Sequence, residues 1–301
     1  MLISTKDQTG IKKIIKDLYL PKKNAHKGEN GKVLIIGGSN LFHAASIWAA
    51  EMASYIVDMV HYSSTKENNE IMTSIKKKFL NGIVIERKDI PKYIEEDDSI
   101  LIGPGMVRAE KKVLNKDQSF TDILKLSNEA HFTRSIVNYS IRHYSDKKFV
   151  FDAGALQMMN KDWLLDLKIK PIITPHEIEF ERLFGISLKV EAEDKRIEIV
   201  KEYADKYNCI ILLKGVKDIV SDGKTYYLIE GGNAGLAKGG TGDVLASLCC
   251  SFFAKNNPLL SATLSSFLVK KTADGLFLKQ GYWYNVSNLI EAIPKTLKDL
   301  I

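Results

Sequence analysis

The chain has 301 residues, of which 45% are hydrophobic, and carries a formal net charge of +6. This length and apolar content allow a substantial core, so a disordered chain is not expected. The positive charge is spread through short lysine-rich pieces such as Lys76-Lys77-Lys78, which argues against a nucleic-acid partner.

Cysteine usage and hydropathy bear on the compartment. Cys209, Cys249 and Cys250 lie in apolar surroundings, and their number and spacing fit neither a disulfide framework nor a zinc site. We therefore expect a reducing compartment, the cytoplasm. The first 20 residues are interrupted by charges every few positions, unlike a signal peptide. No apolar run is long enough to cross a bilayer, so no membrane partner is expected.

The first expected element is a helix at residues 11–20, which Pro21 ends, within a short N-terminal extension of 25 residues. A compact apolar run at residues 33–36 predicts a buried strand that stops at a glycine turn, and residues 43–57 then show a helical pattern. Further buried strands are expected at residues 83–85, 99–102, 149–152, 172–174 and 209–213.

Strands that are apolar throughout need helices on both faces, and helical stretches lie between most of these strands. The pattern therefore predicts an α/β fold with a doubly wound, mainly parallel sheet. Residues 218–221 and 225–230 flank Asp222-Gly223, which predicts a β-hairpin. Helices are expected over residues 243–255 and 259–279, with a short one near 286–292. No linker divides the chain, so we expect a single domain over residues 1–301.

A glycine-rich stretch precedes the first of these C-terminal helices. Six of the thirteen residues from 231 to 243 are glycine, where average usage near 7% predicts about one. Glycines let a backbone approach a ligand closely, and the unpaired amides at a helix start bind anions. The stretch thus predicts a phosphate site formed by Gly239, Gly240, Thr241 and Gly242. It is not a Walker A motif, which disfavours P-loop enzymes.

Asp243 lies at the mouth of this anion site. Its carboxylate could accept the proton of a hydroxyl group that attacks a phosphoryl group, while the amides of Thr241 and Gly242 stabilise the transferring charge. The alternative is that Asp243 only caps the helix behind a flexible loop.

Several motifs occur in a fixed order between residues 26 and 294. They are His26-Lys27-Gly28 with Gly31, residues 33–39, Gly103-Pro104-Gly105, Asp152-Ala153, Thr174-Pro175-His176 with Glu179 and Leu183, Leu213-Lys214-Gly215, and residues 232–245. Together they resemble the ADP/ATP-dependent NAD(P)H-hydrate dehydratases of the ribokinase-like superfamily. The resemblance implies a ribokinase-like fold and a repair reaction, in which a nucleotide phosphorylates the hydroxyl group of NADH hydrate or NADPH hydrate and phosphate then leaves.

The resemblance also implies roles for individual residues. Asp243, with Gly242 and Thr241, would be catalytic; Lys214, Gly239, Gly240, Asn233 and Gly235 would bind the nucleotide, ADP or ATP; His176, Asp152, Gly105 and Ala44 would bind the substrate; and Glu179 would hold Mg²⁺, largely through water. A homo-oligomer is implied as well. From the residues alone, His176 and Glu179 also suit a plain helix start, and Asp152 could cap the segment that follows it.

The chain departs from the family pattern in its N-terminal half, where the substrate would bind. The departures are Phe42, Ala44, Val57, Met59, Met106-Val107 and Gly154. Two other functions are therefore compared with the dehydratase. One is a kinase that phosphorylates a small alcohol. It would share the glycine-rich segment and Asp243 with the dehydratase, so only the substrate pocket distinguishes the two. The other is a non-catalytic nucleotide-binding protein, against which the joint presence of Asp243, Lys214 and Glu179 argues.

Overall fold

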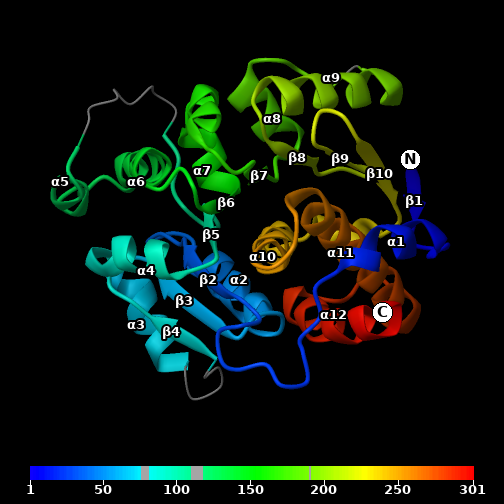
Figure 1. The fold of residues 1–301 in the computed structure, drawn as a ribbon, viewed down its shortest axis with the longest axis horizontal. Coiled ribbons are helices and arrows are strands. Elements are labelled where there is room, and N and C mark those ends of the chain that lie inside the picture. The colour runs from blue at the N-terminus through cyan, green and yellow to red at the C-terminus, as the bar shows by residue number, and fades with distance from the viewer. Residues whose placement is uncertain (76–80, 110–117, 190) are drawn as a thin grey trace.

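The computed structural model describes residues 1–75, 81–109, 118–189 and 191–301, so the lysine-rich piece at residues 76–78 lies outside the described residues. Within the described ranges, ten strands form one sheet in the order β1-β10-β9-β8-β7-β6-β5-β2-β3-β4 (Figure 1). Neighbours are parallel, except that β9 is antiparallel to β8 and to β10. The strands are β1 (Leu2–Ser4), β2 (Lys32–Ile36), β3 (Met59–Ser63), β4 (Gly82–Val84), β5 (Ser99–Ile102), β6 (Lys148–Phe151), β7 (Ile172–Ile173), β8 (Ile210–Leu213), β9 (Asp218–Ser221) and β10 (Tyr226–Glu230).

Helices cover both faces of this sheet (Figure 1). One face carries α1 (Thr9–Ile14), α2 (Ala44–Ser54), α10 (Thr241–Phe253), α11 (Pro258–Gln280) and α12 (Val286–Leu300). The other carries α4 (Ile90–Glu96), α6 (Glu129–His143), α7 (Ala153–Met158), α8 (Glu177–Phe184) and α9 (Glu193–Lys206). Two further helices, α3 (Lys66–Ile75) and α5 (Phe120–Leu124), lie beside β4 and α6.

The alternation of side chains along the strands explains the two layers. Val33 and Ile35 of β2 lie in the core beneath α2 and α10, whereas Leu34 and Ile36 lie in the core on the opposite face. A strand that buries both faces must be apolar at every position. The expected doubly wound, mainly parallel sheet is therefore confirmed.

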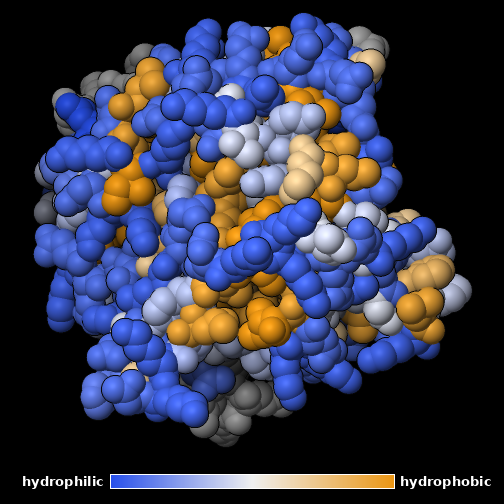
Figure 2. Space-filling view, turned by 45° about the vertical axis from the view of Figure 1, so that its right-hand side comes forward, coloured by the Kyte–Doolittle hydropathy of each residue, from blue (hydrophilic) through white to orange (hydrophobic). Residues whose placement is uncertain are grey.

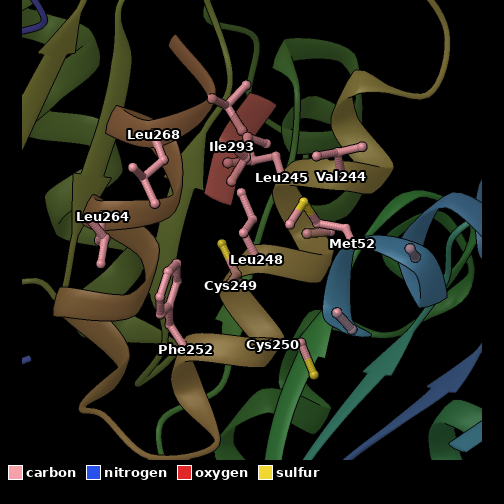
Figure 3. Close-up of a cluster of buried hydrophobic side chains, with 14 of the residues drawn as sticks. Met52, Val244, Leu245, Leu248, Cys249, Cys250, Phe252, Leu264, Leu268 and Ile293 are labelled. Atoms are coloured by element: carbon pink, nitrogen blue, oxygen red, sulfur yellow. The ribbon is translucent and has the colours of Figure 1, made fainter. Parts of the chain in front are cut away.

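Helix α10 is the most enclosed element of the first layer. Every residue from Val244 to Phe253 is buried. Figure 3 shows Met52 of α2, Leu264 and Leu268 of α11, and Ile293 of α12 around the side chains of α10. Packing on several sides fixes the axis of the helix, and therefore the direction in which its first turn points.

The expected elements differ from the observed ones in four places. Strand β3 was not expected, because polar His61 and Ser63 interrupt its apolar run, yet both are buried between β2 and β4. The N-terminal extension also contributes strand β1, which is too short to give a pattern of its own. Its helix is shorter than expected, with α1 followed by a 3₁₀ turn at Ile15–Asp17. Helix α12 continues through Pro294 to Leu300, well beyond the expected end.

The surface is largely polar. Hydrophilic side chains cover most of the face shown in Figure 2, and hydrophobic residues form separate patches. In the part of the chain that the structure describes, no helix combines the length and hydrophobicity needed to span a bilayer.

Candidate functional site

The strand order reverses between β2 and β5, because the chain leaves β2 toward β3 on one side and β5 returns on the other. In open α/β sheets, the crevice at the carboxyl ends of such strands is where ligands bind. The backbones are tightly fitted here: the Gly38 amide donates to the Pro104 carbonyl at 2.7 Å. Gly105, with φ of +68°, leaves only 3.1 Å between an added Cβ and the Phe42 carbonyl oxygen. Gly105 and the start of α2, which carries Ala44, therefore border the same crevice.

Two departures from the family pattern meet in this region. A Cβ atom on Gly154 would lie 2.3 Å from the Met106 carbonyl oxygen and 2.9 Å from the Met106 Cβ. An aspartate at position 154 would therefore collide with the loop that follows β5. Gly154 therefore fits closely against Met106, and two of the positions that depart from the family pattern are in contact beside this crevice.

An ion-pair network joins the ends of β6, β7 and β8. Lys214 Nζ lies 2.9 Å from Asp152 Oδ1 and 3.7 Å from Glu179 Oε2. Burial alone would lower the pKa of Lys214, but the carboxylates of Asp152 and Glu179 raise it above its ordinary value. Lys214 therefore keeps its charge, and it balances two buried acids as well as facing any phosphate that enters.

Asp152 is held for this network rather than for helix capping. Its side chain makes no capping bond to α7, and its Oδ1 accepts hydrogen bonds from Thr174 Oγ1 at 2.7 Å and from Lys214 Nζ. The next residue, Ala153, has a φ of 44°, which is rare for a residue other than glycine. Such backbone strain collects at functional sites. The capping alternative for Asp152 is therefore wrong.

His176 and Glu179 begin α8 as a capping box. The Nδ1 atom of His176 accepts from the amides of Ile178 and Glu179, and Glu179 Oε2 accepts from the His176 amide. The helix-start interpretation of this pair is thus confirmed. Since Nδ1 accepts these hydrogen bonds, Nε2 is the ring nitrogen that can donate, and it lies 3.4 Å from Glu179 Oε1.

The glycine-rich segment leads directly into the first turn of α10. Gly240, with φ of +100°, is the N-cap residue, and no side chain caps the helix. Asp243 is therefore not the cap, which contradicts the simplest alternative for it. Uncapped amides at the start of a 13-residue helix favour an anion.

Asp243 is poised to exchange a proton near neutral pH. Burial is the main cause that raises its pKa to about 7, and the nearby carboxylates of Asp152 and Glu179 add to the rise, while Lys214 opposes it. A base works best when its pKa lies near the operating pH. The position and the pKa of Asp243 thus suit a general base.

A cavity lies beside the glycine-rich segment and has a volume of ≈ 500 Å³. Its walls come from the ends of β8 and β10, the glycine-rich segment and α11. The lining residues include Lys214, Gly215, Gly232, Asn233, Leu236, Thr241, Gly242, Val269 and Lys270. Of the nucleotide-binding residues predicted from the sequence, Lys214 and Asn233 border this cavity, whereas Gly235, Gly239 and Gly240 do not line it.

Asn233 and Gly235 shape this cavity rather than offer free groups to it. Asn233 Oδ1 accepts from the Gly235 amide and from Tyr284 Oη, and its amide nitrogen donates to the Ala273 carbonyl. A Cβ atom on Gly235 would lie 2.5 Å from the Tyr284 ring. Both residues are therefore held in place by these contacts.

Sequence reasoning missed a second ion pair at the cavity. Lys270 of α11 is buried, lies 3.3 Å from Asp218 Oδ1, and donates to the carbonyls of Gly215 and Val216. Asp218 in turn accepts from the Gly215 amide. The pair holds the turn that forms one wall of the cavity. A lysine directly after the apolar residues 267–269, in the middle of the helix, was the signal that could have revealed it.

The side chains of the site suit a hydrated metal ion better than one that they coordinate directly. In the described ranges, no group of three or more His, Cys, Asp and Glu side chains could hold a metal ion. The Glu179 carboxylate already accepts from the His176 amide and from Gln157 Nε2 at 3.1 Å. Glu179 therefore suits contact to a hydrated Mg²⁺ through water better than direct coordination.

Comparison with known proteins agrees with this architecture. The family model described as NAD(P)H-hydrate dehydratase matches residues 33–295. The bifunctional NAD(P)H-hydrate repair enzyme Nnr of Methanocaldococcus jannaschii is 34% identical over 295 residues, and the match covers 94% of this chain and 51% of that protein. The chain thus spans about half the length of that relative. The ADP-dependent (S)-NAD(P)H-hydrate dehydratase of Nitrosopumilus maritimus is 28% identical, with 92% of each chain covered.

A solved structure shares the fold. The ADP/ATP-dependent NAD(P)H-hydrate dehydratase of Bacillus subtilis, co-crystallised with ATP and Mg²⁺, matches with a TM-score of 0.74 at 20% identity, and the match covers 98% of both chains. The expected ribokinase-like fold is thereby confirmed. With the family model matching most of the sequence, the chain belongs to the NAD(P)H-hydrate dehydratase family.

Proposed function

We propose that this protein uses a nucleotide to dehydrate NADH hydrate or NADPH hydrate back to the working cofactor. The observation that carries the proposal is the position of Asp243. It lies in the first turn of α10, whose N-cap residue Gly240 has no side chain. The charges of Lys214, Asp152 and Glu179 act on its carboxyl group, and its neighbour Gly242 lines the cavity. Family membership supports the same reaction.

In the proposed reaction, the hydroxyl oxygen of the hydrate attacks the terminal phosphorus of the nucleotide. A new O–P bond forms as the bond to the leaving nucleotide oxygen breaks, and Asp243 accepts the hydroxyl proton. The amides of Thr241 and Gly242 stabilise charge on the transferring group. Phosphate then leaves with the electron pair of the C–O bond, and loss of a neighbouring proton restores the double bond.

The nucleotide, ADP or ATP, occupies the ≈ 500 Å³ cavity. Lys214 faces the phosphates while it remains paired with Asp152. Gly239 and Gly240 bring the backbone close to them, and Gly240 is the residue whose positive φ makes the turn possible. Mg²⁺ would be held by the nucleotide phosphates and their waters beside Glu179, and it would neutralise charge on the phosphates.

The substrate lies in the crevice between β2 and β5, against Gly105 and Ala44. His176 faces it through Nε2, and Asp152 orients Lys214. We expect the protein to work as a homo-oligomer in the cytoplasm, where its free buried cysteines stay reduced.

The deciding experiment incubates the protein with NADH hydrate or NADPH hydrate, Mg²⁺ and either ADP or ATP. The expected result is the return of the absorbance of the reduced nicotinamide, with one phosphate released per cofactor restored. The nucleotide that supports turnover identifies the donor. No return with either nucleotide, together with phosphorylation of a simple alcohol, would support the small-molecule kinase. Nucleotide binding without any turnover would support the non-catalytic alternative.

A further inference from the structure

We propose that Arg108 and Arg182 form a binding site for a phosphate group of the dinucleotide substrate. This inference rests on the proposed function and extends it to the part of the substrate that does not react. Arg108 follows the loop after β5, and Arg182 lies on α8. The topology brings these two distant segments together at the carboxyl edge of the sheet.

The two side chains converge on one neutral atom. Arg108 Nη1 lies 2.6 Å and Arg182 Nη1 lies 3.0 Å from the same oxygen, Oε1 of Gln157. Both arginines are exposed, and neither has a carboxylate partner within the residues that the structure describes. Two like charges repel at this separation, so an amide oxygen alone is a weak reason for them to meet. An anion would match them better.

The site is connected to the reaction centre. Gln157 Nε2 donates to Glu179 Oε1 at 3.1 Å, and Glu179 belongs to the ion-pair network of Lys214. None of Arg108, Gln157 and Arg182 lines the nucleotide cavity. The arginines therefore suit the substrate better than the phosphoryl donor.

The chemistry of the substrate fits this position. A nicotinamide dinucleotide carries its phosphates several bonds away from the reacting ring, so their binding site must lie outside the reaction centre. Guanidinium groups bind phosphate oxygens through paired N–H donors, more specifically than lysine does. An incoming phosphate oxygen would replace Gln157 Oε1 between the two guanidinium groups.

The test compares wild type with Arg108→Met, Arg182→Met and the double variant. We expect the KM for the hydrate to rise about 10- to 100-fold in the double variant, which corresponds to the loss of charge-assisted hydrogen bonds. The KM for the nucleotide and kcat should stay within about twofold. A rise for both hydrates would place the pyrophosphate between the arginines, and a rise for NADPH hydrate alone would place the 2′-phosphate there.

Arg196→Met is the matched control, because it removes a positive charge that is already near Glu177, at 3.6 Å. It should leave every KM unchanged. Since both arginines of the proposed site are exposed, the variants should fold, which circular dichroism checks. An unchanged hydrate KM, or a rise confined to the nucleotide KM, would overturn the inference.

Calorimetric titration of NADH and NADPH gives a readout that does not need turnover. If the wild-type protein repairs no hydrate but binds NADPH, loss of NADPH binding in the double variant would still support the arginine site.

Discussion

The nucleotide side and the substrate side of this molecule are built in different ways. The proposed nucleotide cavity is lined mainly by one continuous, glycine-rich segment, residues 231–242. The substrate side is assembled from single side chains that follow different strands, such as Asp152 after β6 and Glu179 after β7. An assembled site depends on how the loops that carry its residues pack, as the close contact between Gly154 and Met106 shows.

The largest effect on nucleotide binding is expected from Gly242→Val. The backbone at 242 is ordinary, because φ is not positive there and the positive φ of this turn belongs to Gly240. An added Cβ at 242 would instead lie 3.5 Å from Lys214 Nζ. A valine therefore fills the space between the helix start and Lys214, and we expect nucleotide binding and activity to be lost with little loss of stability.

Gly275→Ala is the matched control, because a Cβ there also meets nothing within 4 Å and the residue lies on α11 without lining the cavity. It should bind the nucleotide nearly as wild type does. Calorimetric titration of ADP and ATP, with a thermal melt of each variant, separates a blocked site from a damaged fold. Normal affinity in Gly242→Val would mean that phosphate does not lie against this residue.

The next largest effect is expected from Asp243→Asn. The amide keeps the shape of the side chain but cannot accept a proton, so kcat should fall about 100- to 10,000-fold. Nucleotide affinity should stay close to that of wild type, as calorimetry can verify. Because Gly240 is the N-cap residue, a merely structural Asp243 would show up as full activity in this variant.

The sequence was sufficient for the sheet, for most strands and for the nucleotide segment, because these are local patterns of hydrophobicity and glycine. It could not predict β3, whose polar His61 is buried against Asp97 at 2.9 Å. Nor could it predict contacts such as Asp218 with Lys270, since the pairing depends on how α11 packs on the sheet. The roles of individual site residues, including Ala44 and Gly105, stay predictions until variants are measured.

A pH profile sharpens the role of Asp243 further. Since its pKa is raised to about 7, kcat/KM should rise with pH through that value, by up to about tenfold per unit on the acid side, as the carboxylate becomes available as a base. The same shift affects stability. Because the pKa of Asp243 is higher in the folded than in the unfolded protein, its protonated carboxyl group contributes to the free energy of unfolding. This contribution is fully present below the ordinary pKa of 3.8, and it is lost as the pH rises through about 7.

It follows that Asp243→Asn should melt at a higher temperature than wild type in mildly alkaline buffer, and that the difference should shrink in acid. Thermal melts of both proteins across this range measure it. Coincident melting curves at every pH, with a flat kcat/KM profile, would show that burial does not perturb this carboxyl group.

The smallest effect is expected where the nucleotide wall is held from behind. Lys270 does not have to touch a ligand to matter, because it donates to the carbonyls of Gly215 and Val216 and so fixes the turn next to Lys214. Removing it alone would leave the buried Asp218 unpaired, which is strongly destabilising, so the double variant Asp218→Asn/Lys270→Met is the better probe. With both charges gone, the turn should move more freely. The nucleotide KM should then rise about five-fold, the equivalent of one neutral hydrogen bond, while the hydrate KM stays constant.

Lys271→Met serves as the control, since the neighbouring Lys271 donates to the Thr5 carbonyl instead. Equal KM values for the double variant and for wild type would mean that the turn is rigid without the pair, and that the nucleotide side depends on its glycine segment alone.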